Sequence, residues 1–281
     1  MRLAVTSDIH IDKNGDVALT ALAERVSALR PDVLLVSGDI ATSPAIYLQT
    51  LLTLKSVAPE LLLVAGNHDV WTTPDAALRG LDSFVRLEKI LPALAREAGA
   101  RLLDEAPVEI GGIGFVGSLG WYDLSTRERL LDVPDSAYHA GEWGGLRWMD
   151  HHYANWYQEG HRLDCVAVAG LLRARLAQHL AGMTTRRIVA ATHMLAFSEQ
   201  IHRKPHPGWS FVNAFMGSYA LGELLRADPR VALHIAGHTH LPSDVRIGRL
   251  RAVVSPLGYK GEWAGATVEQ AVRRAVTLIE L

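Results

Sequence analysis

The sequence predicts an α/β protein whose core is a parallel sheet covered by helices on both faces. Short apolar runs alternate with longer amphipathic segments along most of the chain, which is typical of βαβ units. The runs are apolar throughout, as expected of strands that are buried on both faces. With 49% hydrophobic and 21% charged residues among 281, the composition favours a globular protein with a large core.

The first half of the chain contains three predicted strands, each followed by a helix. The strands are expected at residues 3–6, 33–37 and 61–65, and the helices at 17–29, 45–57 and 74–98. Since a helix lies between successive strands, we expect the three strands to run parallel in one sheet.

The second half continues this alternation and then changes. Helices are expected at 166–181 and 212–226, and strands at 187–191 and 231–236. Short turns such as Gly248-Arg249 join the last part of the chain, which favours antiparallel pairing. Three such late strands are expected, at 244–247, 251–255 and 274–281.

One aromatic segment departs from the alternation. Residues 121–157 hold four of the seven tryptophans and four of the seven tyrosines, with weak periodicity. We therefore predict a single domain over residues 1–281 that carries an insertion or cap at about 121–165. The aromatic side chains could form the hydrophobic core of this insertion or a platform on which a ring stacks.

Composition limits the partners and the compartment. The 28 basic and 30 acidic residues give a net charge of −2, which argues against binding to long nucleic acids. The amino terminus does not resemble a signal peptide, and no apolar run is long enough to cross a membrane. The single cysteine, Cys165, excludes an internal disulfide and is expected to be a small core residue. These features predict a soluble cytoplasmic protein.

Five polar clusters directly follow predicted strands. In α/β sheets, the loops at the carboxyl ends of the strands direct several side chains to one point. Aspartate, asparagine and histidine together suit divalent metals such as Mn, Fe or Zn, and so many donors favour two ions bridged by one carboxylate. The clusters are Asp8-Ile9-His10, Gly38-Asp39, Gly66-Asn67-His68-Asp69, Thr192-His193 and Gly237-His238-Thr239-His240.

The order and spelling of these clusters resemble the calcineurin-like metallophosphoesterases. The family's blocks are D-x-H, G-D, G-N-H-[DE], H and G-H-x-H, and all five occur here in that order over nearly the whole chain. The resemblance implies a two-sheet α/β sandwich flanked by helices. It also implies a centre of two divalent metal ions and the hydrolysis of a phosphate ester by a metal-activated hydroxide.

The same resemblance implies a role for each matching residue. His68 would contact the phosphate and protonate the leaving group, and Asp69 would orient His68. Many members have Asp or Asn three residues after the bridging aspartate, where this chain has Thr42, so the support around that aspartate is expected to differ. The metal ligands would be divided between two ions that share Asp39: Asp8, His10 and His240 for one, and Asn67, His193 and His238 for the other.

The expected function is that of a phosphoesterase for a small, nucleotide-like phosphate ester. Asp69 stands where many phosphatases of the family have Glu, which favours a phosphodiesterase. A phosphomonoesterase and a non-catalytic metal-binding scaffold are the alternatives, and missing ligands would mark the scaffold. Arg203 and Lys204 could contact substrate phosphate or lie in a solvated loop. The segment 198–210 could form a lid together with 121–157.

Overall fold

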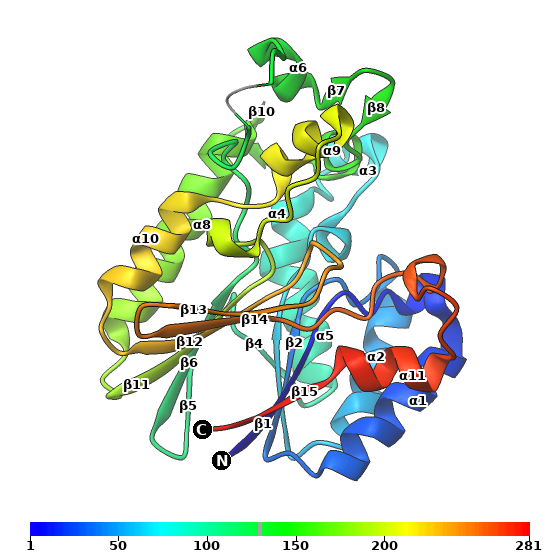
Figure 1. The fold of residues 1–281 in the computed structure, drawn as a ribbon, viewed down its shortest axis with the longest axis vertical. Coiled ribbons are helices and arrows are strands. Elements are labelled where there is room, and N and C mark those ends of the chain that lie inside the picture. The colour runs from blue at the N-terminus through cyan, green and yellow to red at the C-terminus, as the bar shows by residue number, and fades with distance from the viewer. Residues whose placement is uncertain (129–130) are drawn as a thin grey trace.

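Two mixed sheets face each other in the computed structural model, which describes residues 1–128 and 131–281 (Figure 1). One sheet has five strands and the other has six. Helices cover the outer face of each sheet (Figure 1). The predicted α/β class and the two-sheet sandwich are confirmed, and so are antiparallel pairs near the carboxyl terminus.

The first sheet has the strand order β15-β1-β2-β3-β4. Strands β1 to β4 run parallel, and β15 pairs antiparallel with β1 at the edge. The bounds of the strands are Arg2–Thr6 for β1, Val33–Ser37 for β2, Glu60–Val64 for β3, Arg101–Leu102 for β4 and Thr277–Glu280 for β15.

The second sheet has the order β13-β14-β12-β11-β6-β5. Its four central strands run parallel, while β5 and β13 at the two edges pair antiparallel with their neighbours. The bounds are Val108–Ile110 for β5, Ile113–Ser118 for β6, Arg187–Thr192 for β11, Val231–Ala236 for β12, Ser243–Ile247 for β13 and Leu250–Val254 for β14.

The core between the sheets is made by alternate residues of the parallel strands. In β1, Leu3 and Val5 face the other sheet, where they meet residues such as Phe115 of β6 and Ile235 of β12. The residue between them, Ala4, packs instead against the helices. Because successive side chains of a strand point to opposite faces, each apolar run supplies both layers at once, and this explains why the runs are apolar throughout.

Long helices pack on the outer faces of the sheets. The first sheet is covered by α1 (Ile11–Leu29), α2 (Pro44–Lys55), α5 (Leu91–Glu97) and α11 (Val268–Ala275), and the second by α8 (Cys165–Gly182) and α10 (Tyr219–Ala227) (Figure 1). Shorter helices are α3 (Pro74–Leu78), α4 (Ser83–Val85), α9 (Pro207–Val212), and the single turns η1 (His68–Val70), η2 (Arg86–Ile90), η3 (Ser198–Gln200), η4 (Asn213–Phe215) and η5 (Lys260–Glu262). None of the helices in these described parts of the chain combines the length and the apolar composition that a bilayer crossing needs.

The aromatic segment folds into small elements at one end of the molecule (Figure 1). Trp121, Tyr138 and Trp156 are buried there and join the larger hydrophobic core. The elements are α6 (Asp135–Ala140), β7 (Glu142–Trp143), β8 (Leu146–Arg147), α7 (Asp150–Tyr153), β9 (Tyr157–Gln158) and β10 (His161–Arg162).

Strands β4, β5 and β6 lie in a part of the chain where the sequence analysis expected none. The residues of β6 include two glycines, Gly114 and Gly117, which weaken a strand pattern. A Cβ atom at Gly117 would lie 2.5 Å from side-chain atoms of Leu103 and Val64. The glycine is therefore required where the two sheets approach each other.

Two predicted helices and one strand have different bounds in the structure. The helix expected at 74–98 is divided into α3, α4, η2 and α5, with Gly80 between the first two. The helix expected at 212–226 starts only at Tyr219, because residues up to Phe215 form separate turns. Residues 268–275, part of which was expected to be a strand, form α11, and only Thr277–Glu280 are extended.

Candidate metal centre

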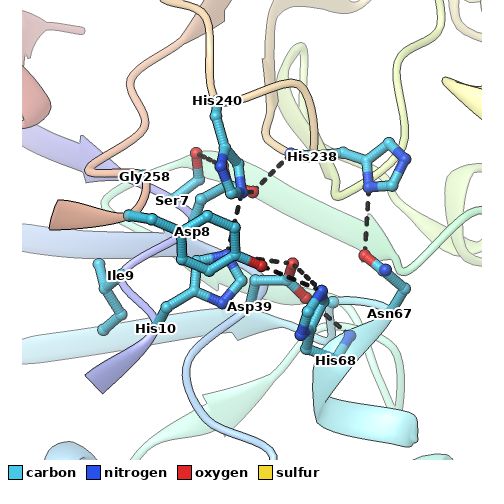
Figure 2. A network of polar contacts seen from close by, with 12 residues as sticks. Ser7, Asp8, Ile9, His10, Asp39, Asn67, His68, His238, His240 and Gly258 are labelled. Carbon is cyan, nitrogen blue, oxygen red and sulfur yellow. Dashed lines mark hydrogen bonds and ion pairs between the residues drawn. The ribbon is translucent and has the colours of Figure 1, made fainter. Parts of the chain in front are cut away.

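The seven predicted ligands all follow strands of the two sheets and meet at one edge of the sandwich, and Figure 2 labels all of them except His193. The first sheet contributes Asp8 and His10 after β1, Asp39 after β2 and Asn67 after β3. The second contributes His193 after β11, and His238 and His240 after β12. A hydrogen bond from the Ser37 hydroxyl to the Thr192 carbonyl, 2.7 Å long, joins the sheets directly below this point.

The backbone that carries these side chains is held in an uncommon conformation. Among the residues that the structure describes, nine other than glycine have a positive φ, and five of these are predicted ligands: Asp8, His10, Asp39, His238 and His240, with φ between 41° and 72°. Such left-handed residues cost of order 1–3 kcal/mol each and persist where the surrounding structure requires them, most often at functional sites. The concentration of left-handed residues at this site indicates that the loop conformations direct the ligand side chains towards a common point.

Two glycines allow the loops to approach closely. A Cβ atom at Gly66 would lie 2.1 Å from the Asp39 backbone nitrogen, and one at Gly38, where φ is +83°, would lie 2.5 Å from the ring of His193. Because any larger residue would separate the Asp39 loop from its neighbours, these positions require glycine.

The first cluster of donor atoms contains Asp8, His10, Asp39 and His240. One potential ligand atom from each lies within 4.8 Å of the others. The Nε2 atoms of His10 and His240 are 3.0 Å apart, and Asp39 Oδ2 is 3.6 Å from His10 Nε2. Asp8 Oδ1 lies 3.5 Å from His240 Nε2. This set of two carboxylates and two imidazoles fits a divalent cation.

The second cluster surrounds the side-chain oxygen of Asn67. Asn67 Oδ1 is 2.8 Å from His193 Nε2 and 3.1 Å from His238 Nδ1. Asp39 Oδ2 is 3.4 Å from the same His193 nitrogen. One oxygen of Asp39 therefore lies beside a nitrogen of each cluster, as a bridging carboxylate would. The residues fit a centre of two ions.

Electrostatic surroundings prepare several of these groups to act as ligands. Burial alone would raise the pKa of Asp39, but His193 and His68 beside it hold that pKa well below its usual range. Burial lowers the pKa of His10 well below its usual value and that of His238 to about 3. Asp39 is therefore ionised and His10 and His238 are neutral, which is the state in which these side chains bind a metal. Burial lowers the pKa of His193, but Asp39 beside it raises that pKa to about 10, so His193 releases a proton when it binds a metal.

Carbonyl and carboxylate oxygens orient three of the histidine rings from behind. His193 Nδ1 is 2.9 Å from the Ser37 carbonyl, and His238 Nε2 is 3.1 Å from the carbonyl of Phe215. His240 Nδ1 is 2.8 Å from a carboxylate oxygen of Glu262. A metal-ligating histidine usually donates its other N–H in this way, which fixes its tautomer. Glu262 belongs to none of the sequence motifs and was not predicted.

Asp69 holds a loop instead of contacting the neighbouring histidine ring. Its buried carboxylate accepts hydrogen bonds from the backbone N–H groups of Asp39, Ile40, Ala41 and Gly66, at 2.8 to 3.0 Å. These contacts differ from the expectation that Asp69 orients His68: they fix the position of the loop that carries Asp39. The Thr42 carbonyl accepts a hydrogen bond from Arg86, 2.6 Å away, so Arg86 also holds the chain just after Asp39.

The ring of His68 reaches the edge of the centre. Its Nε2 atom lies 4.0 Å from Asp39 Oδ2 and 3.5 Å from the hydroxyl of Tyr259. The ring stacks on Trp71 with 3.7 Å between centroids. With 14% of its side chain exposed, His68 can meet a bound substrate while its orientation is fixed by packing.

A cavity of about 270 Å³ opens directly over both clusters. Aromatic rings from three parts of the chain, Trp71, Trp148 and Tyr259, form its walls, and Arg147 and Met149 complete the rim. Of the aromatic segment, Trp121 and Trp156 lie in the hydrophobic core, as considered from the sequence, and Trp148 lines the cavity. Trp71 and Tyr259 were not singled out from the sequence.

The basic residues of the 198–210 segment, Arg203 and Lys204, contact side chains outside the metal centre. Arg203 lies 3.4 Å from Glu128, and the Lys204 ammonium lies over the ring of Trp209, 3.7 Å from its centroid. Neither belongs to the described residues that line the cavity over the clusters.

Comparison with known proteins gives a family and a shared fold. The sequence profile of the calcineurin-like phosphoesterases matches residues 1–242. The solved structure of phosphopantetheinyl hydrolase from Mycobacterium tuberculosis is similar, with a TM-score of 0.72 and 18% identity over 95% of this chain and 93% of that one. A dimetal phosphatase from Danio rerio has a TM-score of 0.48 and 15% identity over 90% of this chain and 86% of that one. No curated protein matches the chain.

Proposed function

The chain belongs to the calcineurin-like phosphoesterase family, and on this premise we propose that it is a two-metal phosphodiesterase for a small substrate. The observation that carries the proposal is the position of Asp39, whose Oδ2 atom lies 3.6 Å from His10 Nε2 and 3.4 Å from His193 Nε2. A carboxylate between two groups of nitrogen and oxygen donors suits a bridging ligand.

The proposed ligand assignment follows the two clusters. When bound, the two ions neutralise the phosphate oxygens and lower the pKa of a water molecule so that it can attack phosphorus. Mn, Fe and Zn suit this mixture of oxygen and imidazole donors. Asp39 would be shared between one ion held by Asp8, His10 and His240, and another held by Asn67, His193 and His238.

His68 and Asp69 would assist in different ways. His68, whose side chain is 14% exposed, would hydrogen-bond a phosphate oxygen or give a proton to the departing alkoxide. Asp69 would act indirectly, because its carboxylate fixes the backbone of the Asp39 loop. The Tyr259 hydroxyl, 3.5 Å from His68 Nε2, would be a second donor to the substrate phosphate.

The cavity supports a small substrate with a planar or apolar group. A volume of about 270 Å³ with three aromatic walls suits a ring stacked beside the phosphate, as in a nucleotide-like ester. We propose that residues 121–165 form a cap, because Arg147, Trp148 and Met149 of this segment contribute to the cavity. The neighbouring structure from Mycobacterium tuberculosis is named a phosphopantetheinyl hydrolase, so a phosphopantetheinyl compound belongs among the substrates to be tested.

The proposal is tested with aryl phosphates and added Mn. Purified protein should hydrolyse a bis-aryl phosphate faster than the matching mono-aryl phosphate. Asp39→Asn and His68→Ala should each lower turnover by about 10²-fold or more, while their melting temperatures stay near that of the wild type. A strong preference for the monoester would assign the chain as a phosphomonoesterase. Undiminished activity in either variant would contradict the roles, and protein that binds metal without activity would favour the metal-binding scaffold.

A further inference from the structure

A buried aspartate from the aromatic segment lies directly behind one of the proposed ligands. Asp150 is the first residue of α7 and is 2% exposed. Its Oδ1 atom accepts a hydrogen bond of 2.8 Å from the amide nitrogen of Asn67 and one of 2.7 Å from the indole N–H of Trp71. Its Oδ2 atom accepts from the indole N–H of Trp148 at 3.1 Å. All three partners are N–H donors, so the carboxylate acts only as an acceptor.

This contact decides which end of the Asn67 side chain faces the histidines. A carboxamide has an oxygen that can ligate a metal and an NH₂ group that cannot. Because Asp150 accepts from the NH₂ group, the oxygen must point the other way. There it lies 2.8 Å from His193 Nε2 and 3.1 Å from His238 Nδ1. Without an acceptor behind it, the amide would be free to turn its NH₂ group towards the centre.

We infer that Asp150 is a positioning residue, which holds the Asn67 oxygen towards the second metal position and joins that ligand to the wall of the substrate cavity. The inference rests on the proposed function, since it assumes that Asn67 binds a metal. Trp71 and Trp148 line the cavity, and both are tied to the same carboxylate as Asn67. One buried charge therefore sets the geometry of a ligand and of two aromatic walls.

Asp150→Leu tests the inference, because leucine has a similar shape and no acceptor atom. Removing a group that orients a metal ligand typically weakens metal binding about 10–100-fold. At limiting Mn, the variant should therefore retain about one ion where the wild type retains two, as measured by metal analysis of equilibrated protein. Turnover should fall in parallel and recover towards the wild-type value with excess Mn.

Asp150→Asn is the matched conservative variant. Its side-chain oxygen can occupy the position of Oδ1 and still accept from Asn67 and Trp71, while its NH₂ group faces Trp148 and loses only that bond. Metal content should therefore stay close to wild type. Trp148→Phe removes the same Trp148 bond from the other side and should also leave metal affinity unchanged, whatever it does to substrate binding.

Several outcomes would overturn the inference. Asp150→Leu with wild-type Mn affinity would do so, as would equal losses in Asp150→Leu and Asp150→Asn. On an Asn67→Ala background, Asp150→Leu should cause no further loss of affinity, and a second full loss would show that Asp150 acts by another route. If the leucine variant does not fold, Asp150→Ala takes its place in the same comparisons. Wild-type protein without bound Mn would contradict the proposed function itself.

Discussion

Glu262 connects one proposed ligand to a loop that carries no motif. One of its oxygens is 2.8 Å from His240 Nδ1 and accepts a second hydrogen bond of 2.7 Å from the Tyr259 backbone. The Tyr259 ring packs against the rings of His10 and His240, with centroids 4.5 and 4.7 Å away. Glu262 therefore fixes both the histidine and the aromatic wall beside it.

Glu262→Ala should weaken metal binding at the Asp8, His10 and His240 position. We expect a loss of affinity of about 10–100-fold, because the His240 ring loses the acceptor that fixes its tautomer and direction. Isothermal titration of metal-free protein with Mn measures this. Glu105→Ala is the control, since Glu105 lies outside both clusters and pairs with the exposed Arg96, 2.6 Å away. Equal Mn affinity in the two variants would contradict the assignment.

At the scale of elements, a buried aspartate ties together the ends of two strands from different sheets. Asp104 accepts hydrogen bonds from the backbone N–H groups of Ala65, just after β3, and of Leu119, just after β6. Burial raises the pKa of Asp104 to about 6. The two hydrogen bonds favour the ionised form and lower the pKa, but their effect is smaller than that of burial. The residues that follow β3 lead directly into the Asn67 loop.

The raised pKa makes the contribution of Asp104 to stability depend on pH. A carboxyl with a pKa of about 6 in the folded chain and 3.8 when unfolded stabilises the fold most at low pH, where it is protonated in both states. The free energy of unfolding of the wild type relative to Asp104→Asn should therefore decrease by about 3 kcal/mol as the pH rises from about 3, below the unfolded pKa, to about 7, above the folded pKa. Urea denaturation of both metal-free proteins measures the difference, and a constant difference over this range would refute the assignment.

At the scale of the whole molecule, the candidate centre belongs to neither sheet alone. The first sheet supplies both carboxylates, the Asn67 amide and His10, and the second supplies His193, His238 and His240. The donors meet only when the sheets are packed together over their shared core. Metal binding and correct packing of the sandwich should therefore support each other.

Those parts of the fold and of the site that follow a local sequence pattern could be predicted from the sequence. Apolar runs followed by helices predicted most of the strands, and the polar clusters after them predicted which side chains converge. Strand β6 was not predicted because Gly117 interrupts its apolar pattern. Close packing against Leu103 requires glycine at that position. The predicted bounds of the helix at 74–98 were also wrong. The local sequence there favours one helix, but tertiary contacts divide the segment into several short ones.

The supporting residues of the site could not be predicted from local patterns. Glu262 lies 22 residues from His240, and Asp150 lies 83 residues from Asn67. A single aspartate or glutamate outside the motifs has no periodicity or spacing that distinguishes it from the other acidic residues of the chain. Only the path of the chain brings these groups behind the ligands. The hydrogen bonds that Asp69 accepts from backbone N–H groups also depend on loop geometry that the sequence does not reveal.

The central claim is that Asp39 is shared by two metal ions held at the meeting edge of the two sheets. A crystal structure of protein grown with Mn, with anomalous scattering recorded for the metal, tests it most directly. We predict two anomalous peaks about 3.5–4 Å apart, both within bonding distance of the Asp39 carboxylate. A single peak, or peaks that do not include Asp39 among their ligands, would contradict the account.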